Sequence, residues 1–461
     1  MDYKEFINAK QKVEIDSGFD VEIEHLNNNL FNYQKRIVKW ALKKGRCALF
    51  EDTGLGKTIQ QLEWANQVHL KTNKPVLIIS PLAVASQTEL EAKKFGIDAK
   101  KINEQSEIVE GINIINYEKL HKIDVSIFSG VVLDESSILK SFTGKTTNML
   151  IDLFKNTPYR LSCSATPSPN DFIEIGTQAE FLGICKKREM LAEFFINDAS
   201  SGIGWRLKGH SELEFYKWIS EWAIVLKNPK DIGFEDEEYK LPNLNIIPII
   251  LDSEIDKNKL FGVTTAKTLS ERREARKEST PAKVEKIVDI INTNADNIFL
   301  VWCNFNNESE LLHKSIANSY EIKGSDTPAH KENGMIQFAN GNIKCLISKP
   351  SICGFGMNWQ KCNNMIFCGL SDSFEQFYQA VRRCYRFGQT KDVNVYIILS
   401  EKELSILDNI KDKEKKHQQM TSNMIHLLSD KFKIDLDIVK KLNTQIDNYT
   451  QIVKLPIFIK N

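Results

Sequence analysis

The chain has 461 residues, of which 42% are hydrophobic and 26% are charged. This length predicts two to three domains, and the composition is that of a globular chain, which excludes disordered and fibrous classes. The formal net charge is zero. Overall electrostatics therefore do not indicate a nucleic-acid-binding protein, and any such binding requires local basic patches.

The sequence carries no sign of a membrane segment or a structural metal site. No apolar run approaches the roughly 20 residues that a membrane-spanning helix needs, and residues 1–10 contain no apolar signal core. We therefore expect no membrane partner and a cytoplasmic location. The nine cysteines include no CxxC pair, which favours free buried thiols over a zinc site.

The first part of the chain alternates between strands and helices. An amphipathic helix at 33–42 precedes short apolar runs that predict strands at 47–50, 76–80, 112–115, 130–133 and 159–162. Helical patterns separate these strands, for example at 59–70 and 86–95. The alternation is typical of a parallel sheet with helices on both faces. We assign residues 1–182 to a first lobe of this kind.

The rest of the chain divides into three further segments. Residues 183–280 are rich in aromatic residues, become acidic at 234–239 and contain a charged run at 271–277. They predict a mostly helical insertion or lobe connector. A second lobe is predicted at 281–402, with strands at 298–302, 345–348, 364–368 and 393–399, and a charged helical extension at 403–461. The insertion and the extension are where we expect any protein partner to bind.

The segment EDTGLGKT, residues 51–58, stands between a predicted strand and a predicted helix. In this context glycines let backbone N–H groups approach phosphate, and the helix N-terminus adds positive potential. Lys57 is predicted to bridge the β and γ phosphates of ATP, and Thr58 to hold Mg²⁺. The strict GxxxxGK[ST] pattern has Glu51 at its first glycine, so a glycine turn without a ligand is the alternative. The predicted nucleotide contacts are Thr53, Gly54, Gly56, Lys57 and Thr58.

Two further features complete the expected site from the first lobe. In GVVLDESS, residues 130–137, Asp134 ends a buried strand and is placed to reach Mg²⁺, while Glu135 is placed to polarise the attacking water. An acidic pair after an apolar strand is common by itself and gains weight from the upstream glycine loop. Gln34 can pair with the N6 and N7 edge of adenine, although an isolated glutamine is more often solvated.

The segment QAVRRCYRFGQT, residues 379–390, carries Arg383 and Arg386 at i and i+3, which would share one helix face. An isolated run of this kind is more often a solvated surface. Beside a nucleotide site, a positioned arginine stabilises the γ-phosphoryl transition state and can contribute about 10³–10⁵ in rate. We therefore expect the second lobe to complete a site whose catalytic residues are Lys57, Asp134, Glu135, Arg383 and Arg386.

Taken together, these motifs resemble the Swi/Snf-like ATPases of helicase superfamily 2, above all a compact branch often encoded by phages and prophages. The resemblance runs in order through most of residues 30–400. The matching segments are YQ at 33–34, DTGLGKT at 52–58, VLIISPLAV at 76–84, IINYEKL at 114–120, DESS at 134–137, SAT at 164–166, VWCNF at 301–305, IKGS at 322–325, GFGMNWQ at 354–360 and QAVRRCYRFGQ at 379–389.

The resemblance implies an α/β fold of two tandem RecA-like lobes, parallel sheets flanked by helices, with a helical insertion and a helical C-terminal tail. It makes Arg383 and Arg386 arginine fingers and places Gln379 at the nucleotide. It also assigns lobe coupling to Ser137, Ser164, Ala165 and Thr166. Ser136 and Ser137 stand where the family usually has Ala-His, a departure that bears on coupling more than on hydrolysis.

Loops at the strand ends of both lobes are expected to face a nucleic acid. Small residues, hydroxyls and backbone N–H groups suit contact with the sugar-phosphate backbone, which fixes register without reading sequence. The predicted contacts are Ser80, Pro81, Asn116, Tyr117, Lys349, Gly354 and Asn358.

These observations predict an ATP- and Mg²⁺-dependent DNA translocase or helicase, with DNA favoured over RNA, acting in a bacterial host or encoded by a phage. The resemblance favours movement along duplex DNA over strand separation. An RNA-stimulated ATPase of the same superfamily and a catalytically silent scaffold remain alternatives. A nuclease is least supported, because no carboxylate cluster beyond residues 134–135 suggests a metal centre.

Overall fold

The computed structural model describes residues 16–141, 143–168, 171–198, 204–234, 241–251, 269–354, 358–416, 418–419 and 421–426, with residues 82–83 and 269–276 described by their backbone alone. The predicted acidic run at 235–239, most of the charged run at 271–277 and the predicted extension beyond residue 426 lie outside the residues whose side chains are described. Among the described residues, no helix is long and apolar enough to cross a membrane.

The first lobe is built on a seven-stranded sheet in the order β3-β4-β2-β5-β6-β1-β9. All of its strand pairs are parallel. The strands are β1 Arg46–Glu51, β2 Val76–Ser80, β3 Ala99–Lys101, β4 Ile112–Asn116, β5 Gly130–Asp134, β6 Tyr159–Cys163 and β9 Ala223–Leu226. Every residue of β2, β4 and β5 is buried, as expected for central strands with both faces covered.

Helices cover both faces of this sheet. They are α2 Asn32–Lys44, α3 Lys57–Thr72, α4 Leu82–Lys94, α5 Lys145–Phe154 and α6 Ile175–Leu182. Alternate residues of β1 enter different cores: Cys47 and Leu49 pack with α2 and α3, whereas Ala48 and Phe50 pack with α5 and α6. This period of two places the carboxyl end of β1, and the glycine loop that follows it, between two packed layers.

The aromatic segment after α6 packs on the first lobe. It contains α7 Lys187–Phe194, the antiparallel hairpin of β7 Phe195–Asp198 and β8 Gly204–Leu207, and α8 Glu212–Trp222. Trp218 lies 5.9 Å from Phe215 and 5.3 Å from Trp222, centroid to centroid. These rings join the hydrophobic core of the first lobe, so Trp218 stabilises the fold.

The second lobe has a six-stranded sheet in the order β10-β15-β14-β11-β13-β12, again with parallel pairs throughout. Its strands are β10 Leu244–Leu251, β11 Phe299–Trp302, β12 Ser319–Glu321, β13 Cys345–Ser348, β14 Asn364–Cys368 and β15 Val393–Ser400. Its helices are α9 Leu269–Thr293, α10 Asn306–Ser315, α11 Pro328–Ala339, α12 Pro350–Cys353 and α13 Phe374–Val381. The predicted fold class, two tandem RecA-like lobes of parallel sheets flanked by helices, is confirmed.

The range 183–280 contributes strands that the sequence did not predict. We expected a mostly helical connector, but β9 pairs with β1 in the first sheet and β10 pairs with β15 in the second. Each sheet thus takes an edge strand from this range, and β10 tolerates Pro248 because an edge strand can lack a ladder donor. Helix α9 also begins at Leu269 and continues through Pro281. The division of the chain into four segments remains a prediction.

Short 3-10 helices occupy several connections. They are η1 Ile23–His25, η2 Gln105–Glu107, η3 Tyr117–Lys122, η4 Val125–Ile127, η5 Ser136–Lys140, η6 Phe172–Glu174, η8 Gly209–Ser211, η9 Pro229–Ile232 and η10 Glu401–Glu403.

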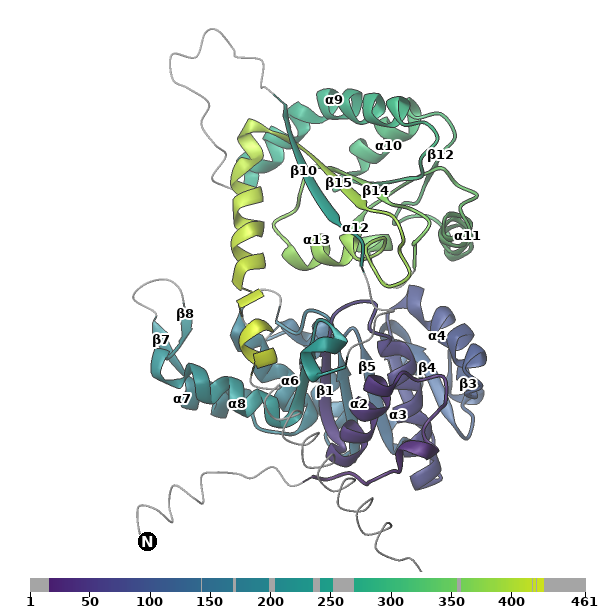
Figure 1. Ribbon diagram of the computed structural model, residues 1–461, viewed down its shortest axis with the longest axis vertical. Coiled ribbons are helices and arrows are strands. Elements are labelled where there is room, and N and C mark those ends of the chain that lie inside the picture. Colours follow the sequence, from purple (N-terminus) through teal and green to yellow (C-terminus); the bar gives the residue numbers. More distant parts are fainter. Residues whose placement is uncertain are drawn as a thin grey trace, which may run out of the picture.

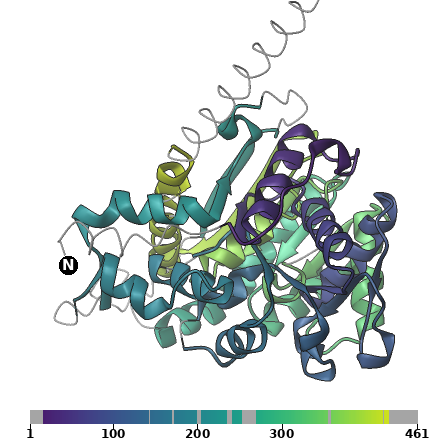
Figure 2. The same cartoon turned by 90° about the horizontal axis from the view of Figure 1, so that it is seen from below.

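The described residues between 404 and 426 are helical and run from the second lobe to the first (Figure 1). Ile406 and Ile410 belong to the hydrophobic core of the second lobe. Met424, which is 1% exposed, belongs to that of the first. Seen from below, this helical segment and the helices of residues 187–222 lie side by side (Figure 2), and Asn423 Nδ2 donates to Glu212 Oε1 at 3.5 Å. The segment therefore contacts both cores.

Candidate active site

The glycine loop joins the end of β1 to the start of α3. Gly54 and Gly56 have φ values of 90° and 77°, in the left-handed region that favours glycine. A Cβ on Gly56 would also lie 2.3 Å from Gln34 Nε2. Backbone conformation and close packing therefore both require glycine at position 56.

Gln34 supports this loop through its side-chain amide. Its Nε2 donates to Leu55 O at 2.9 Å, as does the hydroxyl of Tyr33. Its Oε1 accepts from Phe31 N at 2.9 Å. The structure thus places Gln34 in contact with the loop backbone, and its pairing with adenine stays a prediction.

A cavity of about 240 Å³ lies between the two lobes at the mouth of this loop. Its first-lobe walls are the glycine loop, the end of β5 and one face of α4, and its second-lobe walls are segments 358–360 and 383–387. The predicted site residues in its lining are Thr53, Gly54, Gly56, Lys57, Thr58, Asp134, Glu135, Arg383 and Arg386. Residues predicted from distant motifs therefore meet in one space.

Lys57, the first residue of α3, holds its amine at the mouth of the loop. Its Nζ donates to Glu51 O at 2.7 Å and to Asp52 O at 3.0 Å. Both partners are backbone carbonyls of the loop itself. The ammonium group is thus fixed beside the cavity without an acidic side chain bonded to it in the described contacts.

The acidic pair lies at the carboxyl end of β5. Asp134 Oδ1 accepts from Gln61 Nε2 at 2.9 Å, and Glu135 has a left-handed backbone with φ of 56°, a strained conformation that is concentrated at functional sites. Burial raises the pKa of both carboxyl groups, and the neighbouring Asp134 raises the pKa of Glu135 further, while Lys57 lowers both. Glu135 Oε2 is buried with no hydrogen-bond partner among the described residues. A buried carboxyl group with a raised pKa suits proton transfer near neutral pH.

Arg383 reaches the cavity from the second lobe while 3% exposed. Its Nε donates to Gln379 O at 3.1 Å and its Nη2 to Gln379 Oε1 at 3.2 Å. Burial lowers the pKa of Arg383, and Glu135 opposes this shift. Gln379 thus holds the guanidinium group of Arg383, and its expected place at the nucleotide stays a prediction.

The prediction that Arg383 and Arg386 share a helix face is wrong, because α13 ends at Val381 and both arginines lie on the following turns. The amide of Gln389 explains how the turns are held. Its Nε2 donates to the carbonyls of Gln360, Cys362 and Cys384 at 3.0, 3.0 and 3.2 Å. Both arginines still line the cavity.

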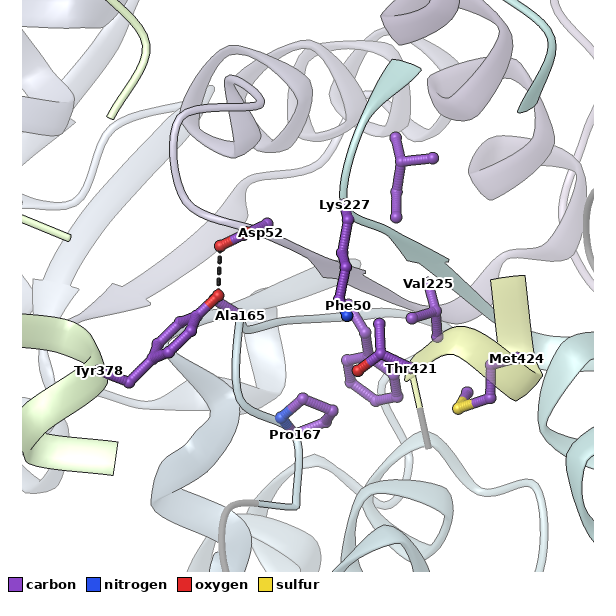
Figure 3. Close-up of a pocket in the computed structure, with 10 residues that line it drawn as sticks. Phe50, Asp52, Ala165, Pro167, Val225, Lys227, Tyr378, Thr421 and Met424 are labelled. Carbon is purple, nitrogen blue, oxygen red and sulfur yellow. Dashed lines mark hydrogen bonds between the residues drawn. The ribbon is translucent and has the colours of Figure 1, made fainter. Parts of the chain in front are cut away.

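The predicted lobe-coupling segment follows β6. Ser164 N donates to Leu49 O at 3.2 Å, and Ser164 Oγ accepts from Thr166 N at 3.1 Å. Ala165 lines a small pocket with Tyr378 of α13 and Met424 of the C-terminal helix (Figure 3). This segment therefore lies where both lobes and the C-terminal helix meet.

The other predicted coupling residue, Ser137, is buried in η5 at 4% exposure. The contact from η5 to the second lobe runs instead through Lys140, whose Nζ donates to Glu375 Oε2 of α13. Lys140 lies three residues after Ser137 and was not predicted. Coupling through Ser137 stays a prediction.

The predicted nucleic-acid contacts of the first lobe lie at adjacent strand ends. Ser80 and Asn116 are register partners at the ends of β2 and β4, and Pro81 follows at the start of α4. Asn116 Oδ1 accepts from Lys119 N at 3.0 Å and so caps η3. The hydroxyl of Tyr117 donates to Asp134 O at 2.8 Å, which connects this edge to the acidic pair.

In the second lobe, Lys349 and Gly354 cap the two ends of α12. A Cβ on Gly354 would lie 2.1 Å from Pro350 O, so this glycine is needed for packing. Asn358 lines the interlobe cavity, and its contact with nucleic acid stays a prediction. The loop of Asn358 is held at the cavity by a hydrogen bond that Trp359 N donates to Arg383 O at 3.0 Å.

Sequence reasoning missed three residues that join the lobes beside the cavity. Asp52 Oδ1 accepts from the hydroxyl of Tyr378 at 2.5 Å (Figure 3), and Asp52 Oδ2 accepts from Arg382 Nη2 at 2.6 Å. Motif comparison passes over Arg382 because the family pattern leaves that position variable.

Reasoning from motifs also missed the wall that α4 supplies. Gln87, Thr88, Glu91 and Lys94 line the cavity, at spacings that place them on one helix face. That periodicity was the available signal, but polar residues at such spacing usually indicate a solvated face.

Two family models match the chain: the SNF2-related domain over residues 33–200 and the helicase conserved C-terminal domain over residues 282–388. They fall on the two lobes whose residues form the cavity, with β9, β10 and β15 outside the matched ranges. The chain belongs to the Swi/Snf-like ATPases of helicase superfamily 2.

This Swi/Snf-like chain is similar to several curated proteins. It is 23% identical to the SWI/SNF-related matrix-associated actin-dependent regulator of chromatin subfamily A-like protein 1 of Xenopus laevis, over 83% of this chain and 43% of that protein. It is 22% identical to putative protein p41 of Acyrthosiphon pisum secondary endosymbiont phage 1, over 76% of this chain and 87% of that protein. An uncharacterized ATP-dependent helicase of Bacillus subtilis is 24% identical over 76% of this chain and 72% of its own length.

The chain spans less than half the length of the Xenopus relative, so that protein's activity as a whole does not transfer to it directly. Among solved structures, the Sulfolobus solfataricus SWI2/SNF2 ATPase core in complex with dsDNA matches with a TM-score of 0.43 and 19% identity. The match covers 88% of this chain and 96% of that one.

Proposed function

We propose that this Swi/Snf-like protein is a DNA translocase that hydrolyses ATP between its two lobes and moves along duplex DNA. One observation carries the proposal: Lys57 and Glu135 of the first lobe line the same cavity as Arg383 and Arg386 of the second. Hydrolysis in such a site depends on the relative position of the lobes, which is what a motor requires.

Each residue has a role that follows from its position. Lys57, fixed at the mouth of the glycine loop, binds the β and γ phosphates of the substrate ATP. Glu135, with its raised pKa, accepts a proton from the attacking water. Arg386 and Arg383 stabilise the charge that spreads over the γ-phosphoryl oxygens in the transition state.

The residues present also fit a magnesium ion. Thr58 and Asp134 line the same cavity as Lys57, and Mg²⁺ is commonly held by one or two protein oxygens together with substrate phosphates. Within the described residues, no group of three or more His, Cys, Asp or Glu could hold a metal by itself. The ion would neutralise charge on the β and γ phosphates.

The choice of polymer rests on family membership and on loop chemistry. The Bacillus relative is named an ATP-dependent helicase and the Xenopus relative a regulator of chromatin, which favours DNA over RNA here. Pro81 and Lys349 are half-buried at strand ends and supply backbone and cationic groups suited to contact with the sugar-phosphate backbone. Ser80 has no solvent exposure, and the Tyr117 hydroxyl donates to Asp134 O, so contact through these two residues requires a local rearrangement. Protein partners at the aromatic segment or the C-terminal helix, and action in a bacterial cytoplasm, stay predictions.

ATPase assays with duplex DNA, single-stranded DNA and RNA test the proposal, with Lys57→Ala as the inactive control. Duplex DNA should stimulate turnover most, and the stimulation should fall steeply as salt rises, because backbone contacts release counterions. Stronger stimulation by RNA would support the RNA-stimulated alternative. A parent protein without turnover in any condition would support the silent scaffold.

A further inference from the structure

Helix α13 presents three polar side chains to the first lobe. They are Glu375, Tyr378 and Arg382, at positions i, i+3 and i+7, so they lie along one face of the helix and its C-terminal cap. Glu375 bonds to Lys140 of η5, while Tyr378 and Arg382 bond to Asp52 of the glycine loop. We call these two sets of contacts the interlobe clasp.

The two ends of the clasp have opposite charge arrangements: the second lobe contributes a negative charge at one end and a positive charge at the other. At one end the second lobe supplies the negative charge, Glu375, to meet Lys140. At the other end it supplies the positive charge, Arg382, to meet Asp52. Reversing or sliding the helix would bring like charges together, and such repulsion restricts a docked pair to one register.

The Asp52 end of the clasp is held tightly. Arg382 and Asp52 side chains are 15% and 9% exposed, so their short charge-assisted bond is only weakly screened by solvent. The guanidinium group also lies 5.0 Å from the ring centroid of Tyr378 and 5.1 Å from that of Tyr385. These rings help to hold Arg382 in the position in which it meets Asp52.

Both ends of the clasp adjoin catalytic segments. Asp52 belongs to the loop that carries Lys57, and Lys140 ends the 3-10 helix that follows Glu135. Arg382 directly precedes Arg383, whose guanidinium group reaches the cavity. A shift of the clasp therefore moves the arginines relative to the glycine loop.

We infer that the interlobe clasp sets the closed position from which Arg383 and Arg386 act, and that Asp52, Arg382, Lys140 and Glu375 are positioning residues for ATP hydrolysis. The inference rests on the proposed function and adds to it the residues that fix lobe closure. A misplacement of about 1 Å in an active site can cost on the order of 10²-fold in rate, so polar contacts far from the phosphate can control turnover.

Two sets of variants test the clasp. The first set is Arg382→Ala, Arg382→Lys and the matched control Lys391→Ala, which removes an exposed cation of the second lobe. Arg382→Ala should lower kcat at least about tenfold while ATP affinity, measured by direct binding, changes less than about threefold. Arg382→Lys should recover part of kcat because it keeps the charge, and Lys391→Ala should match the parent.

The second set reverses charges at the other end: Lys140→Glu, Glu375→Lys and the double variant, with the exposed Lys145→Glu as control. Each single reversal should lower kcat, and the double variant should recover a large part of the loss, because it restores opposite charges across the lobes. Additive losses without recovery would show that Lys140 and Glu375 do not act as a pair. Circular dichroism melting confirms that each variant is folded.

Small-angle X-ray scattering supplies a readout that does not depend on activity. Arg382→Ala should have a larger radius of gyration than the parent and should respond less to a non-hydrolysable ATP analogue. If the parent lacks ATPase activity while Arg382→Ala still expands, the proposed function fails and the clasp stands. Variants with parental kcat and radius, or with a raised kcat, would overturn the positioning role.

Discussion

Gln379 and Arg383 form a paired contact inside the second lobe: the backbone and side-chain oxygens of Gln379 accept from the guanidinium group of Arg383 at 3.1 and 3.2 Å. Gln379 has no solvent exposure. The glutamine of this motif therefore holds the guanidinium group of Arg383, and its contact with the nucleotide stays a prediction.

Gln379→Ala should lower ATP turnover by roughly ten- to a hundredfold, because Arg383 loses its contact with Gln379 Oε1 and keeps only the one to the backbone oxygen of residue 379. ATP affinity should change much less, since Gln379 does not line the cavity. Equilibrium binding of a fluorescent ATP analogue, measured beside steady-state turnover, separates the two effects. A loss of affinity as large as the loss of turnover would return Gln379 to the nucleotide.

Glu135→Gln should retain ATP binding and lose hydrolysis. The amide keeps the shape of the side chain but cannot accept the proton of the attacking water. Binding and single-turnover hydrolysis should be measured on the same preparation. Loss of both together would make Glu135 a structural residue.

Arg386→Ala should reduce turnover by roughly 10³-fold or more and weaken ATP binding far less, because its contribution arises in the transition state. Arg383→Ala should behave similarly. The double variant should be little worse than either single variant, because both arginines act on one closed state. Hydrolysis by Arg386→Ala at the parental rate in saturating DNA would contradict the interlobe mechanism.

Glu51→Gln should stabilise the first lobe in a pH-dependent way. Burial raises the pKa of Glu51 from 4.5 to about 7, so the folded protein favours the neutral carboxyl group. The stability that goes with this raised pKa is fully present below pH 4.5 and is lost as pH rises through about 7.

Urea denaturation should therefore give similar stabilities for Glu51→Gln and the parent near pH 5, with a widening advantage for the variant up to pH 8. The glutamine can keep the bond that Gln60 Nε2 donates to Glu51 Oε2 at 2.8 Å. A difference that is constant with pH would show that Glu51 is charged in both states.

Lys283→Met should destabilise the second lobe strongly. Lys283 and Glu403 form an ion pair of 2.5 Å with no exposure of either side chain, and removal of one partner from a buried pair costs about 3–5 kcal/mol. Adding Glu403→Gln should recover much of the loss because no buried charge remains. Chemical denaturation measures both variants, and additive losses would argue against coupling of the two charges.

The central strands and the nucleotide motifs could be predicted from the sequence because their signals are local. The run VLIIS at 76–80 is apolar throughout since both faces of β2 are buried, and the glycines at 54 and 56 are required by the loop backbone itself. By contrast, β9 consists of four residues directly after Trp222 in an aromatic segment, and no turn residue marks its start.

The clasp could not be predicted for a different reason. Asp52 and Arg382 are separated by 330 residues, and neither lies in a sequence motif that would identify the other as its contact. Their pairing depends on how two separately formed lobes dock. Local sequence patterns do not contain this information.

The C-terminal helical segment has a mechanical consequence. Ile406 and Ile410 are embedded in one lobe, and Met424 is embedded in the other, so the segment acts as a strut with two fixed ends. While both ends stay seated, the lobes can pivot about the strut but cannot draw straight apart. If one lobe moves relative to the other on a bound polymer, the surface by which that lobe holds the polymer would then follow an arc. The arc would be longer the farther this surface lies from the C-terminal segment.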